Sequence, residues 1–179
     1  MNVSIPVLAL AAVISSGCSQ PVSPSGPMSG LGGELAADAV PFRGTLEGTF
    51  TFVPEAAPST FAAAHLHASG VATQLGRFTL DAPHRVDLST VVATGQGTFE
   101  MTAANGDRLT GQLLGLGTPT DDPVVYSVEE TYTVTGGTGR FADASGSFTA
   151  RRIVNLATLV TTGTLEGTVS RSHKVVPNE

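Results

Sequence analysis

The chain has 179 residues and a net charge of −6, and its one lysine is Lys174. It has no basic run, which excludes the usual nucleic-acid-binding chemistry because that chemistry neutralises phosphates with Lys and Arg. The 21 glycines, the frequent threonines and the absence of tryptophan predict an all-β protein, since β-branched residues fit pleated sheets and glycine breaks helices.

An apolar run, VSIPVLALAAVI, occupies residues 3–14 and is too short to cross a bilayer as a stable helix. It is followed by the tetrapeptide SSGC, which ends at Cys18 and resembles the lipobox of bacterial lipoproteins. The resemblance implies a signal peptide over residues 1–17 and an acylated Cys18, which would place the protein in the bacterial cell envelope. The alternative is an ordinary cleaved signal peptide with a cysteine nearby, and then a secreted protein.

Residues 18–40 are rich in Ser, Pro and Gly and have no strand pattern, so we expect a flexible tether. The folded domain is expected over residues 41–171, and a C-terminal tail over residues 172–179. Because Cys18 is the only cysteine, this domain contains no disulfide. A tether of this kind fits a domain that is held off a membrane by an N-terminal lipid.

Strand alternation begins at Phe42 and continues through most of the domain. Residues 54–66, PEAAPSTFAAAHL, break the alternation and predict a loop or a short helical turn. The pair Asn105-Gly106 predicts a tight hairpin, because both central residues of such a turn need positive φ. The other expected strands cover about residues 68–80, a stretch after Pro83, residues 95–103 and 108–116, the two arms of a hairpin at 124–150, and residues 158–170.

These elements amount to about eight strands joined mostly by short links. Such a meander closes most naturally into an antiparallel up-and-down barrel, because closure removes the exposed edges. The segment GTLEGT occurs at residues 44–49 and again at residues 163–168. If the two copies lie side by side, they mark the place where the barrel closes; the alternative is a chance repeat in a Gly/Thr-rich sequence.

Two opposite charges fall on the apolar faces of neighbouring strands in the hairpin region. Alternation places Glu130 on the same face as Tyr132, and it places Arg152 on the same face as Phe148. An unpaired buried charge is costly, so we expect Glu130 and Arg152 to pair inside the barrel, with Tyr132 or Gln74 completing the hydrogen bonds. The alternative is a ligand-binding cavity lined by Gln74, Tyr126, Glu130, Tyr132 and Arg152.

The segment TGGTGRFADASG, residues 135–146, is entered from a strand and left by one. It resembles the Gly-rich hairpin of the allene oxide cyclase and dirigent proteins, while GRFTL at 76–80 and GTFEMTAANGDRLTG at 97–111 resemble uncharacterised bacterial exported members of that superfamily. The resemblance implies an eight-stranded, calycin-like barrel over about residues 42–171. It also implies a buried carboxylate acting in an apolar interior, for which Glu130 is the candidate, although the cavity cysteine of the family has no counterpart here.

The remaining motifs give no cofactor and no metal site. Residues 137–142 satisfy GxGxxA, but the dinucleotide fingerprint requires a following helix, and here the chain is expected to enter a strand. His65 and His67 could supply two metal ligands, whereas zinc needs three or four, and neither His84 nor His173 has a matching spacing. We therefore expect both to be ordinary surface histidines.

Three hypotheses of function follow. The first is an exported barrel that binds a small apolar ligand or a partner without assignable catalysis, touches a membrane only through its lipid, and is free to form oligomers. The second is a cyclase or isomerase in which Glu130 acts on a reactive substrate. The third is a structural role in the envelope. A cavity with convergent polar groups would favour the first two hypotheses, and a filled barrel would favour the third.

The substitution Cys18→Ser tests the lipid anchor. Without the thiol there is nothing to acylate, so the exported protein should move from the membrane fraction to the soluble fraction, as measured by fractionation and immunoblotting. If the wild-type protein is already soluble after export, the lipobox interpretation is wrong.

Overall fold

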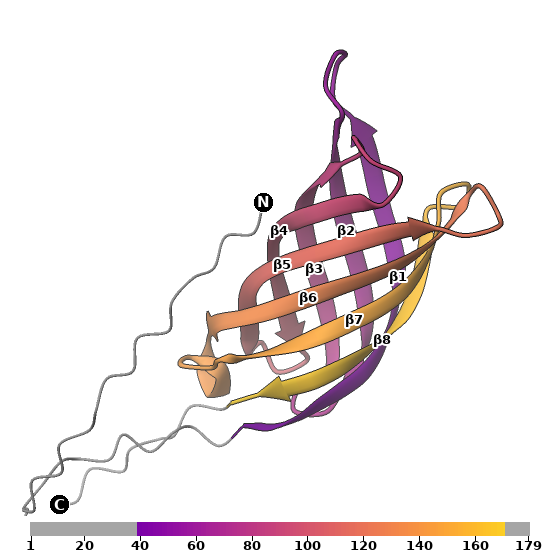
Figure 1. The fold of residues 1–179 in the computed structure, drawn as a ribbon. Helices are drawn as coiled ribbons and strands as arrows, with labels where there is room; N and C mark the ends of the chain where they lie inside the picture. The colour runs from indigo at the N-terminus through magenta and orange to yellow at the C-terminus, as the bar shows by residue number, and fades with distance from the viewer. Residues whose placement is uncertain (1–38, 171–179) are drawn as a thin grey trace, which may run out of the picture. The chain divides into compact units, whose positions relative to one another are not determined.

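The computed structural model describes residues 39–170, which contain eight strands and one short 3₁₀ turn (Figure 1). The predicted signal peptide, Cys18, nearly all of the tether and the C-terminal tail lie outside the described residues. Within residues 39–170, no helix is long and apolar enough to span a bilayer. The elements are β1 (Val40–Pro54), β2 (Phe61–Ala72), β3 (Gly76–Asp87), β4 (Ala93–Ala103), β5 (Arg108–Pro119), β6 (Val125–Gly137), η1 (Gly139–Phe141), β7 (Gly146–Asn155) and β8 (Val160–Val169).

The strands form a closed antiparallel barrel in which each strand pairs with the next one along the chain and β8 pairs with β1. The predicted eight-stranded up-and-down architecture is therefore confirmed. The two GTLEGT copies meet at the closing seam, where Gly44 lies opposite Leu165 and Leu46 lies opposite Gly163. Closure gives every strand two neighbours, so no long edge is left unpaired.

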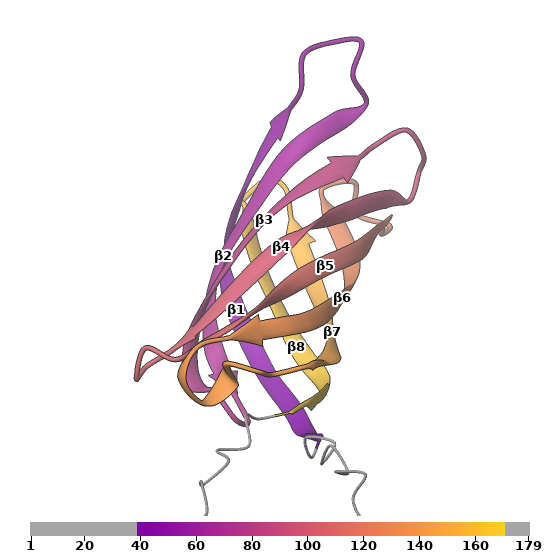
Figure 2. The same cartoon turned by 90° about the vertical axis from the view of Figure 1, so that its left-hand side faces the viewer.

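The barrel has two chemically different ends. At one end β1 begins, β8 ends, short turns join β2 to β3 and β4 to β5, and the longer segment that contains η1 joins β6 to β7; we call it the packed end. The other four connections lie at the opposite end, in the upper half of Figure 2; we call it the open end. The names refer to the barrel interior next to each end: large side chains fill one half, and a cavity occupies the other.

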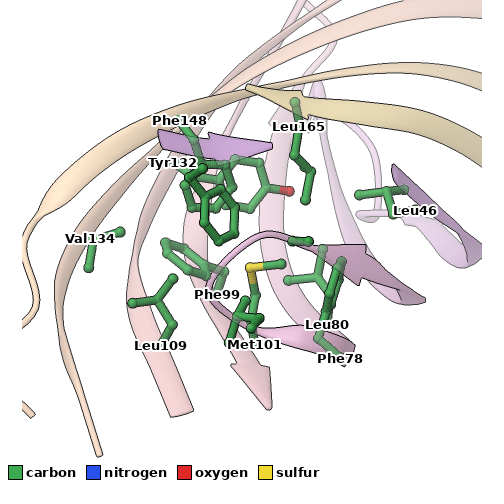
Figure 3. Close-up of a cluster of buried hydrophobic side chains, with 14 of the residues drawn as sticks. Leu46, Phe78, Leu80, Phe99, Met101, Leu109, Tyr132, Val134, Phe148 and Leu165 are labelled. Atoms are coloured by element: carbon green, nitrogen blue, oxygen red, sulfur yellow. The ribbon is translucent and has the colours of Figure 1, made fainter. Parts of the chain in front are cut away.

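Large side chains fill the half of the barrel next to the packed end, and Figure 3 shows the cluster that many of them form. Tyr132 stacks on Phe148 with ring centroids 4.9 Å apart, and Phe99 meets Tyr132 edge-on at 5.0 Å. The Gly-rich segment between β6 and β7 adds Phe141, which is fully buried. Other buried members of this core are Phe42, Phe78, Leu80, Met101, Leu109, Val134, Leu165 and Val169.

The predicted strand boundaries were wrong around residues 54–83. Residues 61–66 belong to β2, a turn at residues 73–75 divides the predicted strand 68–80, and Pro83 lies inside β3. The alanines around residue 63 hide the alternation because they are small and apolar on both faces of β2. The turn itself lacks an Asn-Gly pair and relies on positive φ at Gln74 (73°) and Gly76 (70°).

Two predicted turns can be compared with the structure. The hairpin at Asn105-Gly106 is confirmed, but only Gly106 has positive φ (86°). Residues 137–142 pass through η1, a single 3₁₀ turn, before β7 begins. The helix that a dinucleotide fingerprint requires is therefore absent at this position, in agreement with the rejection of that motif.

Some glycines that face the barrel interior lie so close to the neighbouring strand that a side chain at their position would clash with it. A Cβ on Gly97 would lie 2.6 Å from the Cα of His84, whereas the nearest atom to a Cβ on Gly95, on the same face of β4, is 3.6 Å away. The Gly97→Ala substitution should therefore lower the free energy of unfolding by about 1–3 kcal/mol, the usual cost of overpacking. The matched Gly95→Ala substitution should change it by less than about 1 kcal/mol.

Urea denaturation followed by circular dichroism would measure both values. Equal effects of the two substitutions would show that the close approach at Gly97 does not limit packing.

Candidate functional site

The half of the barrel next to the open end contains a cavity of about 280 Å³. Its walls come from β1 to β7 and are mostly apolar, with contributions from Phe50, Leu66, Val128 and Val154. Leu88 and Leu156, which lie in two of the connections at the open end, also line the cavity. The space therefore opens away from the filled half of the barrel.

A buried ion pair forms the floor of this cavity. The side chains of Glu130 and Arg152 both line it, and they are only 3% and 5% exposed. Arg152 Nη2 donates to Glu130 Oε1 at 2.6 Å, and Arg152 Nε donates to Glu130 Oε2 at 3.0 Å. This bidentate geometry is the strongest arrangement available to an Arg–carboxylate pair.

Two neutral hydroxyl groups complete the pair. Tyr132 donates its hydroxyl to Glu130 Oε2 at 2.8 Å, and Arg152 Nη1 donates to Thr161 Oγ1 at 3.0 Å. The Thr161 hydroxyl donates in turn to the carbonyl oxygen of Ile153 at 2.9 Å. Glu130, Arg152, Tyr132 and Thr161 thus form one connected network in which each charged group has several partners, as buried charges require.

Burial and the neighbouring charges shift the pKa values of Tyr132 and Arg152. Burial raises the pKa of the Tyr132 phenol well above its ordinary value, and the negative charge of Glu130 raises it further. Burial alone would lower the pKa of Arg152, but the charge of Glu130 and the hydrogen bonds to it hold that pKa above its usual value. Tyr132 is therefore a neutral hydrogen-bond donor, and Arg152 is a permanent cation.

Glycines on the adjacent strands make room for the two charged side chains. Gly115 lies opposite Glu130 across β5 and β6, and a Cβ there would be 2.6 Å from Glu130 Cγ. Gly163 lies opposite Arg152 across β7 and β8, and a Cβ there would be 2.7 Å from Arg152 Cγ. Each long side chain thus lies across a neighbouring strand and reaches its partner in the barrel interior.

Arg152 has more N–H donors than its hydrogen bonds to Glu130 and Thr161 use. Guanidinium has five N–H groups, and the bonds to Glu130 and Thr161 use Nε and one hydrogen on each terminal nitrogen. One hydrogen on Nη1 and one on Nη2 have no partner among residues 39–170. A molecule in the cavity with an oxygen acceptor could bind to these two donors.

The structure brings together four of the five side chains predicted for the site. Glu130, Arg152 and Tyr126 line the cavity, while Tyr132 lies beneath it and touches Glu130. The prediction for Gln74 was wrong: it lies in the turn between β2 and β3 at the packed end, where its amide nitrogen donates to the carbonyl oxygen of Pro41 at 3.2 Å. The error follows from reading residues 68–80 as one strand.

Sequence reasoning missed Thr161 and His84. Thr161 shares the inward face of β8 with Leu165, so alternation in the predicted last strand could have identified it. His84 lines the cavity wall, and its Nδ1 lies 2.9 Å from the carbonyl oxygen of Ala82. No spacing in the sequence distinguishes His84 from a surface histidine.

A second cluster of chemically active side chains lies on the outer wall of the barrel. His65 and His67 are surface residues, as expected, but Asp81 from β3 lies beside both of them. One ligand atom from each residue can be chosen so that all three lie within 4.8 Å of one another. Strand alternation alone does not reveal this third group, because the position of Asp81 beside His67 depends on the β2–β3 turn at residues 73–75.

The contribution of the buried ion pair to stability can be tested against an exposed ion pair on the same two strands. Glu130→Ala should lower the free energy of unfolding by about 3–5 kcal/mol, because it leaves Arg152 buried without its counter-ion. The control is Glu129→Ala, since Glu129 pairs with Arg151 at 2.9 Å on the same two strands but both side chains are about 60% exposed. That substitution should cost no more than about 1 kcal/mol.

Urea denaturation would measure both losses. The double substitution Glu130→Leu/Arg152→Met should regain most of the stability, since apolar replacement of a buried pair is often neutral. Equal losses for Glu130→Ala and Glu129→Ala would contradict a stabilising role for burial of the pair.

Comparison with known proteins connects this barrel to one group of solved structures. No family model and no curated protein sequence matches the chain. The pterocarpan synthase dirigent protein GePTS1 matches with a TM-score of 0.54 and 14% identity, over 87% of this chain and 98% of that one. The pterocarpan synthase dirigent protein PsPTS1 matches with a TM-score of 0.51 and 14% identity, over 76% and 97% of the two chains. The fold is that of the dirigent-like barrels.

Proposed function

We propose that this protein binds a small, largely apolar and uncharged molecule that carries a hydroxyl or carbonyl group. The site is the cavity at the open end. The observation that carries the proposal is the buried Glu130–Arg152 pair, which forms a polar floor in a cavity with otherwise mostly apolar walls. An apolar pocket with a few convergent polar groups is the usual form of a small-molecule site.

The size of the cavity limits the ligand. Its volume of about 280 Å³ is close to the lower limit of small-molecule sites, which span about 300–1,000 Å³. A ligand of one or two rings fits that volume, with its apolar body against Phe50, Leu66 and Val154. Binding would gain from the apolar surface removed from water.

The charges of the floor argue for an uncharged ligand. Glu130 and Arg152 neutralise each other, so a charged ligand would add a charge without a counter-ion to an apolar space, which is costly. The two remaining N–H groups of Arg152 favour an oxygen acceptor, and hydrogen bonds from a charged donor are about twice as strong as neutral ones. The ligand oxygen is therefore expected at the floor and its apolar part towards the open end.

The geometry supports binding more than proton abstraction by Glu130. Both carboxylate oxygens already accept hydrogen bonds from Arg152, and Oε2 also accepts one from Tyr132. To take a proton from a substrate, Glu130 would have to weaken these bonds. The two dirigent proteins compared above both carry the name pterocarpan synthase, so their names connect those two barrels with a small organic product.

The proposal includes the exported, lipid-anchored location expected from the N-terminal sequence. The apolar run at residues 3–14 and Cys18 support it. An anchored binding protein would sample molecules at the envelope. The Cys18→Ser fractionation experiment tests this part independently of ligand binding.

Three related probes test the binding proposal: 2-naphthol, naphthalene and 2-naphthoate. Titration of the full chain, followed by fluorescence of the probe, should give the tightest binding for 2-naphthol because it offers an uncharged oxygen to Arg152. Naphthalene lacks that oxygen, and 2-naphthoate adds a charge. Native mass spectrometry of protein purified from its source would show whether a molecule of this class is retained.

Two substitutions by tryptophan localise the site. Val128→Trp fills the cavity and should weaken 2-naphthol binding by more than about tenfold, equivalent to about 1.4 kcal/mol. Ile153→Trp places the same side chain at an exposed position outside the cavity and should leave binding unchanged. Equal affinity of wild type and Val128→Trp, or a preference for naphthoate over naphthol, would overturn the proposal.

A further inference from the structure

We infer that the outer wall of the barrel carries a binding site for one divalent transition-metal ion, formed by His65, His67 and Asp81. These residues come from the neighbouring strands β2 and β3, and all three side chains project from the outer wall. The site is separate from the cavity, because none of the three residues lines it. The inference is therefore independent of the proposed ligand.

Both imidazoles converge on the same carboxylate. His65 Nε2 lies 3.0 Å from each oxygen of Asp81, and His67 Nδ1 lies 2.9 Å from Asp81 Oδ2. The two imidazole rings are neighbours, with centroids 3.9 Å apart. Ligand atoms bound to one zinc ion at 2.0–2.2 Å in tetrahedral geometry are about 3.3 Å apart, so small side-chain shifts would seat an ion among these atoms.

The register of the sheet explains why the cluster forms. His65 and His67 lie two residues apart, so they share one face of β2. Asp81 is the direct cross-strand partner of His67, which places its carboxylate against the same pair of rings. The backbone thus fixes the spacing of all three side chains before any ion binds.

Acidic side chains flank the cluster on the side of His67 and Asp81. Glu100 on β4 is the direct cross-strand partner of Asp81, and a groove on the outer wall contains His67, Asp81, Glu100 and Glu47 together. Glu100 also pairs with Arg108 at 3.4 Å, so it is only partly neutralised. These acidic groups favour a cation on that side of the cluster, and Glu100 could move to become a fourth ligand.

The donor types select the class of metal. Imidazole nitrogen together with one carboxylate oxygen suits zinc or copper, whereas magnesium and calcium prefer sites made of oxygen ligands alone. Binding at His65 Nε2 would leave the proton of that ring on Nδ1, and binding at His67 Nδ1 would leave the proton of the other ring on Nε2. Three protein ligands leave one position of a tetrahedral ion for water, for Glu100 or for a group from another molecule.

Calorimetric titration of the metal-free, untagged full chain with Zn²⁺ tests the inference. We expect one ion bound per chain through the cluster. His67→Gln and Asp81→Asn should each weaken binding by more than about tenfold, because even residues that only support a metal ligand are worth about 10–100-fold. The matched control is Asp87→Asn, which removes another carboxylate from β3 outside the cluster and should leave the affinity unchanged.

Nuclear magnetic resonance of the wild-type histidine rings gives a readout that needs no variant. Zn²⁺ should shift His65 Nε2 and His67 Nδ1, while the ring nitrogens of His84 stay in place. Thermal denaturation in the presence of a chelator would verify that each variant folds. The inference is overturned if Zn²⁺ binding is absent, if it survives both cluster substitutions, or if the two ring nitrogens do not move.

Discussion

The Glu130–Arg152 pair is the interaction on which the rest of the interior depends. It lies at the boundary between a half of the barrel filled by aromatic and aliphatic side chains and a half that contains the cavity. Two buried charges are tolerated there because each has a bidentate partner and a hydroxyl group beside it. If either charge were removed, the other would remain in an apolar space, so the pair both completes the core and defines the floor of the site.

The small residues of this sequence are what allow the pair to exist. Gly115 and Gly163 leave space on the neighbouring strands, and the two side chains that cross these glycines meet inside the barrel. The same device recurs in the packed half, where Gly111 and Gly167 face Phe99 and Phe148. Inward glycines thus leave space on the neighbouring strand for some of the largest side chains of the interior.

Period-two alternation predicted the strands and the inward direction of Glu130 and Arg152, because each depends on side-chain parity along one strand. The barrel followed from closing a meander of about eight such strands, and the repeated GTLEGT segment marked the closing seam. Gln74 was misplaced because a turn without Asn-Gly left no signal in the residues around it. Asp81 was missed for the same reason: its position beside His67 depends on the register across that turn. The cavity volume could not be predicted, since it depends on how far side chains from seven strands extend into one space.

Both ends of the described chain lie at the packed end of the barrel, where β1 begins and β8 ends. The mouth of the cavity is at the other end, formed by connections that are internal to the chain. Within residues 39–170, the points where the chain enters and leaves the barrel are therefore both at its base, away from the entrance of the site. This polarity would let a label attached beside Val40 or Val169 leave the entrance through which a ligand arrives unchanged.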